Sequence, residues 1–365
     1  MSQRKKSLKA AKLERAEKRR RARKRKRILV LFLEIIIFVS LLSVGYLMRQ
    51  YEKMKTNEFG DENIWINEGA EKEGYTTVAL FGGDSREGQL LSGTHADTIM
   101  VAAIDNQTKE VKIISVYRDT TFAQADNSIG KANSAYFLGG PKEAIDMLNK
   151  NLDLDITDYV TVDFKVLADV IDLLGGIEVE ITEAEASEMN NYIGETAMVA
   201  GKDAIYVSEG LQKLDGVQAV TYARIRKNVG GDYARTERQR LVVEKVVDKV
   251  KKTDLGTIND IINQVVGQIS TSFELSEILS LAKDVLKYNI GETSGFPFEK
   301  TDGSVEGLGS VVVPLGMLEN VQELHAFLYP KESYTPSEMV ESISADIAYI
   351  TGYSRADYVE PQNAD

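Results

Sequence analysis

The sequence predicts an α/β protein in α/β/α layers, with a mixed central β-sheet flanked by helices and one transmembrane helix near the N-terminus. From residue 75 onward, short β-branched runs are interleaved with longer amphipathic runs, which is the pattern of an α/β fold. Hydrophobic residues make up 43% of the chain and charged residues 27%, a balance typical of globular proteins. An uninterrupted apolar run at 28–47 predicts the membrane helix.

The N-terminal region divides sharply by charge. Residues 1–27 contain 15 basic and two acidic residues, whereas the rest of the chain contains 29 basic and 54 acidic residues, a net charge of −25. Between these parts, the twenty residues 28–47 carry one charge, Glu34, and would span about 30 Å as a helix. A basic arm beside such a segment stays in the cytoplasm. We therefore expect a single-pass protein of the cell membrane, with its acidic bulk outside. The absence of cysteine and the short cytoplasmic arm suit a Gram-positive-type envelope.

Two alternatives explain the N-terminal region less well. A cleaved signal peptide is disfavoured, because the apolar run is long and no small-x-small site follows Leu47. Nucleic-acid binding by the basic arm is also disfavoured, because the arm adjoins a membrane segment and no helix-turn-helix is evident. We expect no nucleic-acid partner.

The expected domains follow composition. Residues 48–74 are polar and aperiodic and suit a stalk, residues 75–352 form one extracytoplasmic domain, and residues 353–365 form a polar tail.

The expected elements alternate along the domain. The run 77–81 predicts a strand that enters a tight Gly82-Gly83-Asp84 loop, and the runs 98–104 and 110–116 predict a hairpin. Strands are also expected at 159–164 and 177–181. Helices are expected at 141–148, 165–174 (capped by Gly175-Gly176), 241–252, 276–288 and 336–351.

Composition also limits the chemistry. The chain has no Cys and only two His, His95 and His325, so thiol chemistry is excluded and any metal should bind carboxylates. Asp84 and Asp97 follow and precede adjacent predicted strands, and two carboxylates suit a Mg²⁺ ion whose shell is completed by substrate phosphates. For either Asp alone, an ordinary turn residue is the alternative.

A group of arginines is the strongest functional signal. If Tyr222–Arg226 is extended, Arg224 and Arg226 project to the same side. If Asp232 caps a helix, then Arg235, Arg238 and Gln239 share one helical face, and Arg118 is a possible fifth arginine. Arginines gathered in an acidic domain suit phosphate or pyrophosphate. The alternative is a solvated basic face paired with acidic residues.

Eight segments in order resemble the LytR–CpsA–Psr family. The resemblance covers residues 75–252 and, more loosely, the chain to residue 351. The segments are FGGDSR (81–86), HADTIM (95–100), SVYRDT (115–120), KANSAY (131–136), VDF (162–164), LLGGIEV (173–179), LDGVQAVTYARIR (214–226) and DYARTERQR (232–240).

The resemblance implies a membrane-anchored enzyme that moves a glycopolymer, such as teichoic acid or capsule, from a polyprenyl-pyrophosphate carrier to peptidoglycan. It implies Asp84 and Asp97 as ligands of Mg²⁺ or Mn²⁺. It also implies a pyrophosphate clamp, with Lys131 and Asn133 in supporting positions; the clamp comprises Arg118, Arg224, Arg226, Arg235 and Gln239, with Arg238 close by. The chain departs from the family at His95, where Arg is usual, and at Tyr117, where Pro is usual.

The expected reaction is a metal-assisted phosphotransfer in which a muramic acid hydroxyl attacks and a lipid-linked phosphate leaves. We expect Arg118 and Arg224 to act at the reacting phosphates, and Asp232 to activate the hydroxyl or to orient the arginines. A polyprenyl-pyrophosphate phosphatase and a non-catalytic wall-binding module remain the alternatives. Transfer and hydrolysis differ only in the acceptor.

Overall fold

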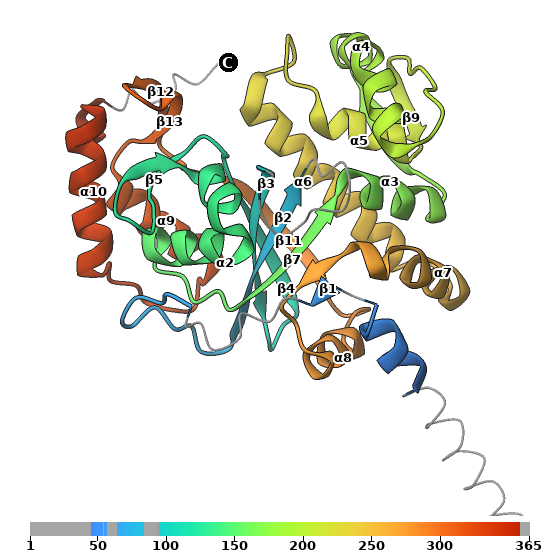
Figure 1. Ribbon diagram of the computed structural model, residues 1–365, viewed down its shortest axis with the longest axis horizontal. Coiled ribbons are helices and arrows are strands. Elements are labelled where there is room, and N and C mark those ends of the chain that lie inside the picture. Colours follow the sequence, from blue (N-terminus) through green and yellow to red (C-terminus); the bar gives the residue numbers. More distant parts are fainter. Residues whose placement is uncertain (1–44, 54, 57–63, 84–92, 94, 358–365) are drawn as a thin grey trace, which may run out of the picture. The chain divides into compact units, whose positions relative to one another are not determined.

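The computed structural model describes residues 45–357, apart from residues 54, 57–63, 84–92 and 94 (Figure 1). The chain forms two compact units, residues 1–53 and residues 54–365. In the first unit, residues 45–51 are helical. Within the described residues, we find no helix with the length and apolar character needed to cross a membrane. Most of the predicted segment 28–47 lies outside the described residues.

The second unit is built on a mixed seven-stranded sheet, as predicted. The strands β2, β3 and β4 are antiparallel neighbours, and β7 and β11 add parallel to β2 and β4. The expected hairpin is confirmed as β3 and β4. In spatial order the strands are β1 (Lys55–Thr56), β10 (Ser270–Thr271), β7 (Asp158–Asp163), β2 (Tyr75–Gly83), β3 (Ala96–Asp105), β4 (Glu110–Val116) and β11 (Asn289–Phe296).

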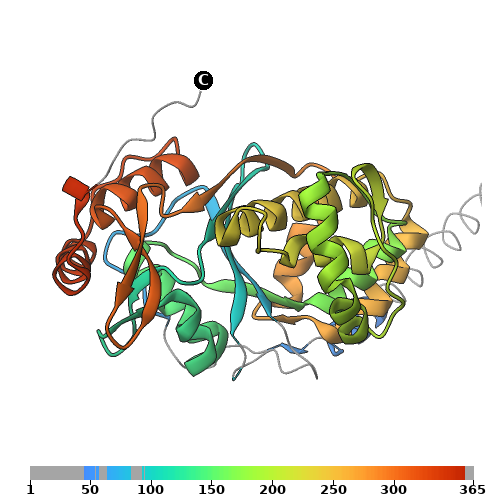
Figure 2. The same cartoon turned by 90° about the horizontal axis from the view of Figure 1, so that it is seen from above.

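Apolar side chains that point alternately to the two sides of the strands form a buried core on each face of the sheet. Phe81 and Val101 lie in the large core on one face, whereas Met100 and Ile113 lie in a smaller core on the other. Successive strand residues point to opposite faces, so these continuous apolar runs require helices on both sides. Figures 1 and 2 show such helices on each side of the strands.

The helices divide between the two faces. One face is covered by α2 (Ala132–Leu152), α9 (Met317–Leu328) and α10 (Glu338–Thr351). The other side carries α3 (Phe164–Leu173), α4 (Glu183–Ala200), α5 (Gly216–Arg224), α6 (Gly231–Val250) and α7 (Leu255–Val265), with η1 (Val266–Gln268) after α7. The remaining elements are α8 (Leu275–Lys283), η2 (Arg355–Asp357) and three hairpins, β5 (Thr121–Ala123) with β6 (Ile129–Lys131), β8 (Ile177–Ile181) with β9 (Gly210–Leu214), and β12 (Lys300–Val305) with β13 (Gly309–Pro314).

The expected helix at 276–288 is too long at its C-terminal end. Helix α8 ends at Lys283, although the apolar pattern continues through Val285 and Leu286. The Asp284 carboxylate pairs with Lys109 at 3.0 Å, and the chain then enters β11 beside β4. Sheet pairing therefore prevails over the local helical pattern.

Candidate functional site

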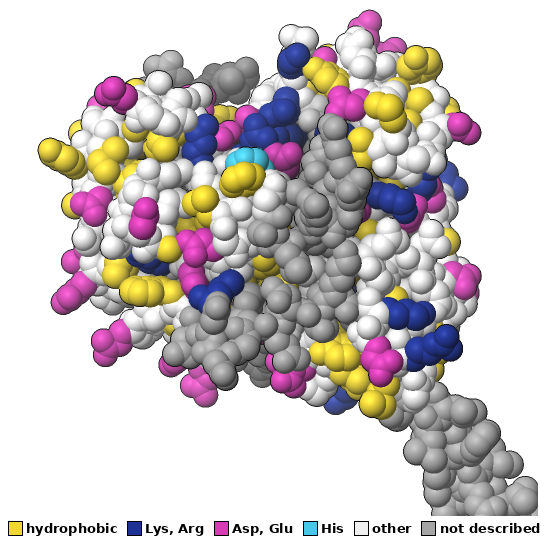
Figure 3. Space-filling view, in the orientation of Figure 1, with side chains coloured by type: hydrophobic (Ala, Val, Ile, Leu, Met, Phe, Trp, Pro, Cys, Tyr) yellow, Lys and Arg dark blue, Asp and Glu magenta, His cyan; other side chains and the backbone are white. Residues whose placement is uncertain are grey.

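A cleft of about 490 Å³ lies between α4, the α5–α6 connection and the first residues of β3. Asp97 enters it from β3, next to the C-terminal end of β2, because Ala96 pairs with Gly83. Figure 3 shows Lys and Arg side chains gathered beside acidic ones near the top of the view. The lining residues are Asp97, Phe164, Glu188, Tyr192, Glu195, Thr196, Arg224, Ile225, Arg226, Lys227, Gly231, Asp232, Arg235 and Gln239.

We had expected the segment that carries Arg224 and Arg226 to be extended, but most of it is helical. Residues 216–224 form α5, which begins with a capping box between Asp215 and Gln218. The chain leaves the helix at Ile225, where ψ is 143°. Because the direction of the chain changes between them, Arg224 and Arg226 still line the same cleft.

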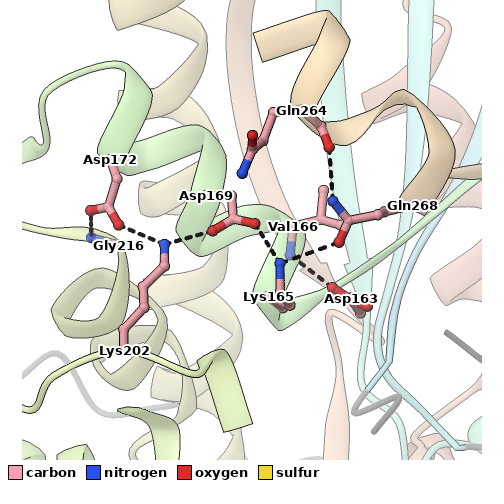
Figure 4. A network of polar contacts seen from close by, with 9 residues as sticks. All are labelled: Asp163, Lys165, Val166, Asp169, Asp172, Lys202, Gly216, Gln264 and Gln268. Carbon is pink, nitrogen blue, oxygen red and sulfur yellow. Dashed lines mark hydrogen bonds and ion pairs between the residues drawn. The ribbon is translucent and has the colours of Figure 1, made fainter. Parts of the chain in front are cut away.

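Close packing against α3 fixes the position of α5. A Cβ atom at Gly216 would lie 2.0 Å from the carbonyl oxygen of Ala168, so only glycine allows this approach. The Gly216 amide donates to Asp172 at 2.6 Å. Lys202 bridges Asp172 and Asp169, each at 2.6 Å (Figure 4). These contacts hold the helix that ends in Arg224.

Arg224 is held by three neighbours. Its guanidinium lies 4.9 Å from the centre of the Phe164 ring, and its Nη1 donates to Thr196 Oγ1 at 3.3 Å. Its Nη2 lies 3.6 Å from Glu195 Oε1. The ring and the two polar partners orient a planar cation toward the cleft.

Asp232 pairs with two arginines at the start of α6. Its Oδ1 lies 3.2 Å from Arg235 Nη2 and 3.5 Å from Arg226 Nη1. It lies in the first turn of the helix and is not the N-cap that we had expected, because Gly230 holds that position at φ 88°. A left-handed cap residue favours glycine.

Arg235 is a buried cation with an unused donor. Its side chain is 6% exposed, and within the described residues its Nε has no hydrogen-bond partner. Burial lowers the pKa of Arg235 to about 10, although the Asp232 charge opposes this shift. A buried guanidinium with an unsatisfied N–H suits an anion acceptor.

Arg118 approaches the cleft through Asp97. Its Nη1 donates to Asp97 Oδ1 at 2.5 Å, and its Nε lies 3.4 Å from Asp119. Burial acts to lower the pKa of Arg118, but the Asp97, Asp119 and Asp232 carboxylates outweigh it and the pKa is raised. The charge of Arg118 also lowers the pKa of Arg235. These two arginines therefore belong to one electrostatic cluster.

Several predicted residues lie outside the cleft lining. Arg238 donates to the carbonyl oxygen of Val229 and lies 3.4 Å from Glu185. We had expected it to share a face with Arg235 and Gln239, but it does not line the cleft with them. Lys131 pairs with Asp119 at 3.1 Å. The Asn133 amide donates to the Arg118 carbonyl and so supports Arg118 through the backbone.

The two departures from the family pattern make aromatic contacts. His95 stacks on Phe137, with ring centres 4.6 Å apart. Tyr117 meets Tyr233 edge-on at 4.7 Å, and the Lys300 ammonium lies 5.1 Å from both tyrosine rings.

Sequence reasoning missed one wall of the cleft. Helix α4 contributes Glu188, Tyr192, Glu195 and Thr196. The first three are spaced by four and three residues, which places them on one helical face and was a signal available in the sequence. Glu188 is 5% exposed, and its Oε1 has no hydrogen-bond partner within the described residues.

The charges of the cleft are nearly balanced. Among the described residues, the lining together with Arg118 has five cationic side chains, Arg118, Arg224, Arg226, Lys227 and Arg235, and four carboxylates, Asp97, Glu188, Glu195 and Asp232, so that five minus four leaves a net charge of plus one. A pyrophosphate diester has one negative charge on each phosphate and would leave the site slightly negative. A divalent cation would offset the two phosphate charges and return the net charge of the described residues and ligand to plus one.

Asp97 fits a role in holding such a cation. Within the described part of the chain, Arg118 engages its Oδ1, and its second oxygen is a ligand of the kind that Mg²⁺ prefers. No group of three or more possible metal ligands occurs among the described residues. A Mg²⁺ ion held by one or two carboxylates and substrate oxygens does not require such a group. Asp84 lies outside the described residues.

The chain is similar in sequence to known proteins. The model of the LytR_cpsA_psr family matches residues 42–324. The chain is 30% identical over 212 residues to the polyisoprenyl-teichoic acid–peptidoglycan teichoic acid transferase TagV of Bacillus subtilis, a match that covers 57% of this chain and 50% of TagV. It is 29% identical over 211 residues to the similarly named TagU of Enterococcus faecalis, covering 57% of this chain and 65% of that protein.

The fold agrees with a solved structure as well. The crystal structure of Bacillus subtilis TagV superimposes with a TM-score of 0.55 and 24% identity, covering 73% of this chain and all of that chain. The matches to the two curated relatives span half to two thirds of those proteins' lengths.

Proposed function

Because this chain belongs to the LytR–CpsA–Psr family, we propose that it is a phosphotransferase that moves an anionic glycopolymer, of the teichoic acid or capsule type, from a polyprenyl-pyrophosphate carrier to peptidoglycan. The names of its relatives TagV and TagU support a teichoic acid transferase. The observation that carries the proposal is the convergence of Arg226 and the buried Arg235 on Asp232, with Arg118 in the same cluster.

The buried cluster argues against a merely solvated basic face. A solvated face would leave its guanidiniums in water, whereas Arg235 is buried with an unused Nε donor. Burying a cation is costly unless partners compensate. Pyrophosphate oxygens would supply those partners, and arginine binds them through paired N–H groups.

The proposed reaction is a single phosphoryl displacement. The oxygen of the acceptor hydroxyl attacks the phosphorus that bears the glycopolymer, and a new P–O bond forms. The bond from that phosphorus to the bridging oxygen breaks, and the polyprenyl phosphate leaves with the electron pair. The hydroxyl proton passes to a cleft carboxylate, for which Asp232 is our candidate. The arginines stabilise the charge that develops on the phosphates.

We propose that Mg²⁺ assists, held by Asp97 and, following the resemblance, by Asp84. When bound, the ion neutralises phosphate oxygens and favours departure of the leaving group. Asp232, paired with Arg226 and Arg235, orients these two guanidiniums. Arg224, stacked on Phe164, lines the same cleft.

We also propose that residues 28–47 anchor the chain in the cell membrane as a single span, with the basic arm inside and the domain outside. The lipid carrier would then share the bilayer with the enzyme. The sequence, with its apolar run between a basic arm and an acidic bulk, supports this part of the proposal.

The test is a transfer assay with the full chain in detergent or nanodiscs. The substrates are a synthetic polyprenyl-pyrophosphate oligosaccharide and peptidoglycan fragments with Mg²⁺, and the product is glycan covalently attached to peptidoglycan. We expect Arg118→Ala and Arg224→Ala to abolish attachment. Arg355→Ala, an exposed arginine paired with Glu299, is the matched control and should retain attachment.

Other outcomes decide between the alternatives. Release of free sugar phosphate without attachment would identify a phosphatase. Tight binding of the pyrophosphate substrate without turnover would identify a binding module. Either result would overturn the transferase.

A further inference from the structure

Helix α8 is amphipathic but contributes no buried residue to a core. Leu279, Ala282 and Leu286 recur at intervals of three and four residues and are all exposed, with Leu286 70% exposed. The chain continues in turns from Asp284 to Lys287, so this apolar stripe extends past the end of the helix. Lys283 and Lys287 adjoin it on the exposed side. An exposed apolar stripe beside lysines is typical of helices that lie in a membrane interface.

Helix α8 lies near β1, the strand at which the chain enters the domain from the N-terminal region. Strand β1 is the edge strand of the sheet and pairs with β10. Helix α8 begins four residues after β10 ends, at Leu275. Figure 1 shows β1 and α8 together at the lower end of the domain. The chain that precedes β1 leads back to the proposed anchor.

The tether between the anchor and β1 is short. Lys55 is only eight residues beyond Leu47, the last residue of the apolar run. Even if fully extended, eight residues reach at most about 29 Å. A compact unit of this size has a diameter of roughly 50 Å. The edge that contains β1 is therefore held close to the bilayer, and α8 belongs to that edge.

A cluster of lysines also supports a membrane contact at the edge of the sheet that contains β1. Residues 245–252, at the end of α6, contain four lysines and one aspartate in a domain that is otherwise strongly acidic. Lys249 and Lys252 line a groove with Asp254 and Thr257 at the start of α7, and α7 and η1 lead directly to β10. Lysines near a bilayer are attracted to anionic lipids.

Other large apolar side chains are also exposed among the described residues, including Trp65, Leu138 and Met198. Two more exposed side chains are tyrosines. Tyr206 is 72% exposed in the connection between α4 and β9, and Tyr349 is 90% exposed on α10. Figure 1 shows α4 and β9 at the opposite end of the domain from β1, and α10 at its far side. Neither group is joined to the short tether, so both serve as comparisons.

We propose that the exposed apolar stripe of α8 inserts into the outer face of the bilayer and, with the lysines of residues 245–252, orients the domain on the membrane. The proposal rests on the membrane anchor that forms part of the proposed function. Its occupant is a lipid surface containing anionic lipid.

The absence of cysteine makes a direct test possible. The full chain, in nanodiscs of phosphatidylcholine and phosphatidylglycerol, would carry one of three substitutions, Leu286→Cys, Tyr206→Cys or Tyr349→Cys, each labelled with bimane. Lipids with nitroxides on the acyl chain would serve as quenchers. An interfacial helix places its apolar face about 5–10 Å into the boundary region. We expect several-fold stronger quenching at position 286 than at 206 or 349, and a several-fold loss when Leu279→Glu is added.

Each other outcome is decisive. Stronger quenching at 206 or 349 would overturn the assignment of the surface. Equal, weak quenching at all three positions in chains retained by nanodiscs would overturn the lipid contact but leave the anchor intact. Protection of position 286 from aqueous iodide without lipid quenching would indicate a protein partner and also overturn it. Chains that fail to enter nanodiscs would overturn the anchor itself. Attachment of glycan to peptidoglycan is measured separately in detergent. A wrong proposal about the transferase activity can therefore be distinguished from a wrong proposal about the membrane contact of α8.

Discussion

The Asp232 carboxylate lies 3.2 Å from the Arg235 guanidinium, one turn along α6, and helps to keep this buried side chain charged. Burial, with Arg118 and Arg226, lowers the pKa of Arg235 to about 10, whereas Asp232 acts to raise it. The pair therefore influences the pH range in which Arg235 stays charged.

The first prediction concerns pH. Arg235 loses its charge as the pH rises through its pKa of about 10, so binding of a pyrophosphate substrate should weaken between about pH 9 and 11. Asp232→Asn removes the carboxylate that raises this pKa, so the weakening should begin at a lower pH. Calorimetric titration of polyprenyl pyrophosphate at several pH values would measure it.

Arg235→Gln is the control, since it has no charge to lose at this position and its binding should be weak and flat over the same interval. Circular dichroism at each pH separates the effect from unfolding. If Asp232→Asn left the pH dependence unchanged, the coupling between these two residues would be disproved.

The second prediction tests how α5 positions Arg224. Gly216→Ala would place a Cβ 2.0 Å from the Ala168 carbonyl oxygen, so α5 must move away from α3. We expect a loss of about 1–3 kcal/mol in the free energy of unfolding. We also expect a lower transfer rate, because α5 ends at Arg224. Thermal unfolding and the attachment assay would measure both effects.

Gly194→Ala is a matched control, because Gly194 lies inside α4 and nothing lies within 4 Å of the added Cβ. It should stabilise the helix by about 0.5–1 kcal/mol. Equal effects of the two substitutions would show that the contact between α3 and α5 has no special role.

Elements specified by neighbouring residues could be predicted from the sequence. The β3–β4 hairpin and the glycine-ended helices α3 and α10 depend on local patterns, and they form as expected. The helix at 216–224 was missed, although Asp215 and Gln218 form a capping box that marks its start. The pairing of β4 with β11 joins residues more than 170 positions apart, so local patterns cannot specify it.

The candidate site was predictable only in part, for a geometric reason. Residues four apart on a helix differ by about 40° around the axis, so Arg235 and Gln239 reach one cleft. Arg238 lies about 60° to the other side of Arg235 and contacts Val229 and Glu185 instead. Which part of a helical face meets the cleft depends on tertiary packing, which also brings α4 into the wall.

The third prediction concerns Glu188, a buried carboxylate of the α4 wall with an unpartnered Oε1. A buried oxygen atom without a hydrogen-bond partner destabilises the fold. Glu188→Gln should therefore keep or raise the melting temperature and yet lower the transfer rate, by about tenfold or more, if the carboxylate contacts the acceptor or its proton.

The comparison variant is Glu195→Gln on the same helix, whose carboxylate is half-exposed and pairs with Arg224 at 3.6 Å. We expect Glu195→Gln to change the Michaelis constant for the pyrophosphate substrate, and Glu188→Gln to change turnover. A Glu188→Gln enzyme with unchanged turnover would assign this residue to structure alone.

The fourth prediction concerns the metal. Asp97 pairs with Arg118 at 2.5 Å. Among the residues that the structure describes, it is also the carboxylate that we propose as a ligand of Mg²⁺. EDTA should abolish attachment of glycan, and added Mg²⁺ or Mn²⁺ should restore it. Asp97→Asn should weaken Mn²⁺ binding by at least about tenfold, because an amide oxygen is a neutral and weaker ligand. Electron paramagnetic resonance of free and bound Mn²⁺, in the presence of polyprenyl pyrophosphate, would measure it.

Asp119→Asn is the matched control, because Asp119 also contacts Arg118, at 3.4 Å, but does not line the cleft. If Asp97 acts only by orienting Arg118, both substitutions should weaken pyrophosphate binding while Mn²⁺ affinity stays unchanged. If Asp97 is a ligand, only Asp97→Asn should lower Mn²⁺ affinity. The charge count favours the second result, because the one excess positive charge among the described residues offsets only one of the two phosphate charges, whereas a divalent ion would offset both.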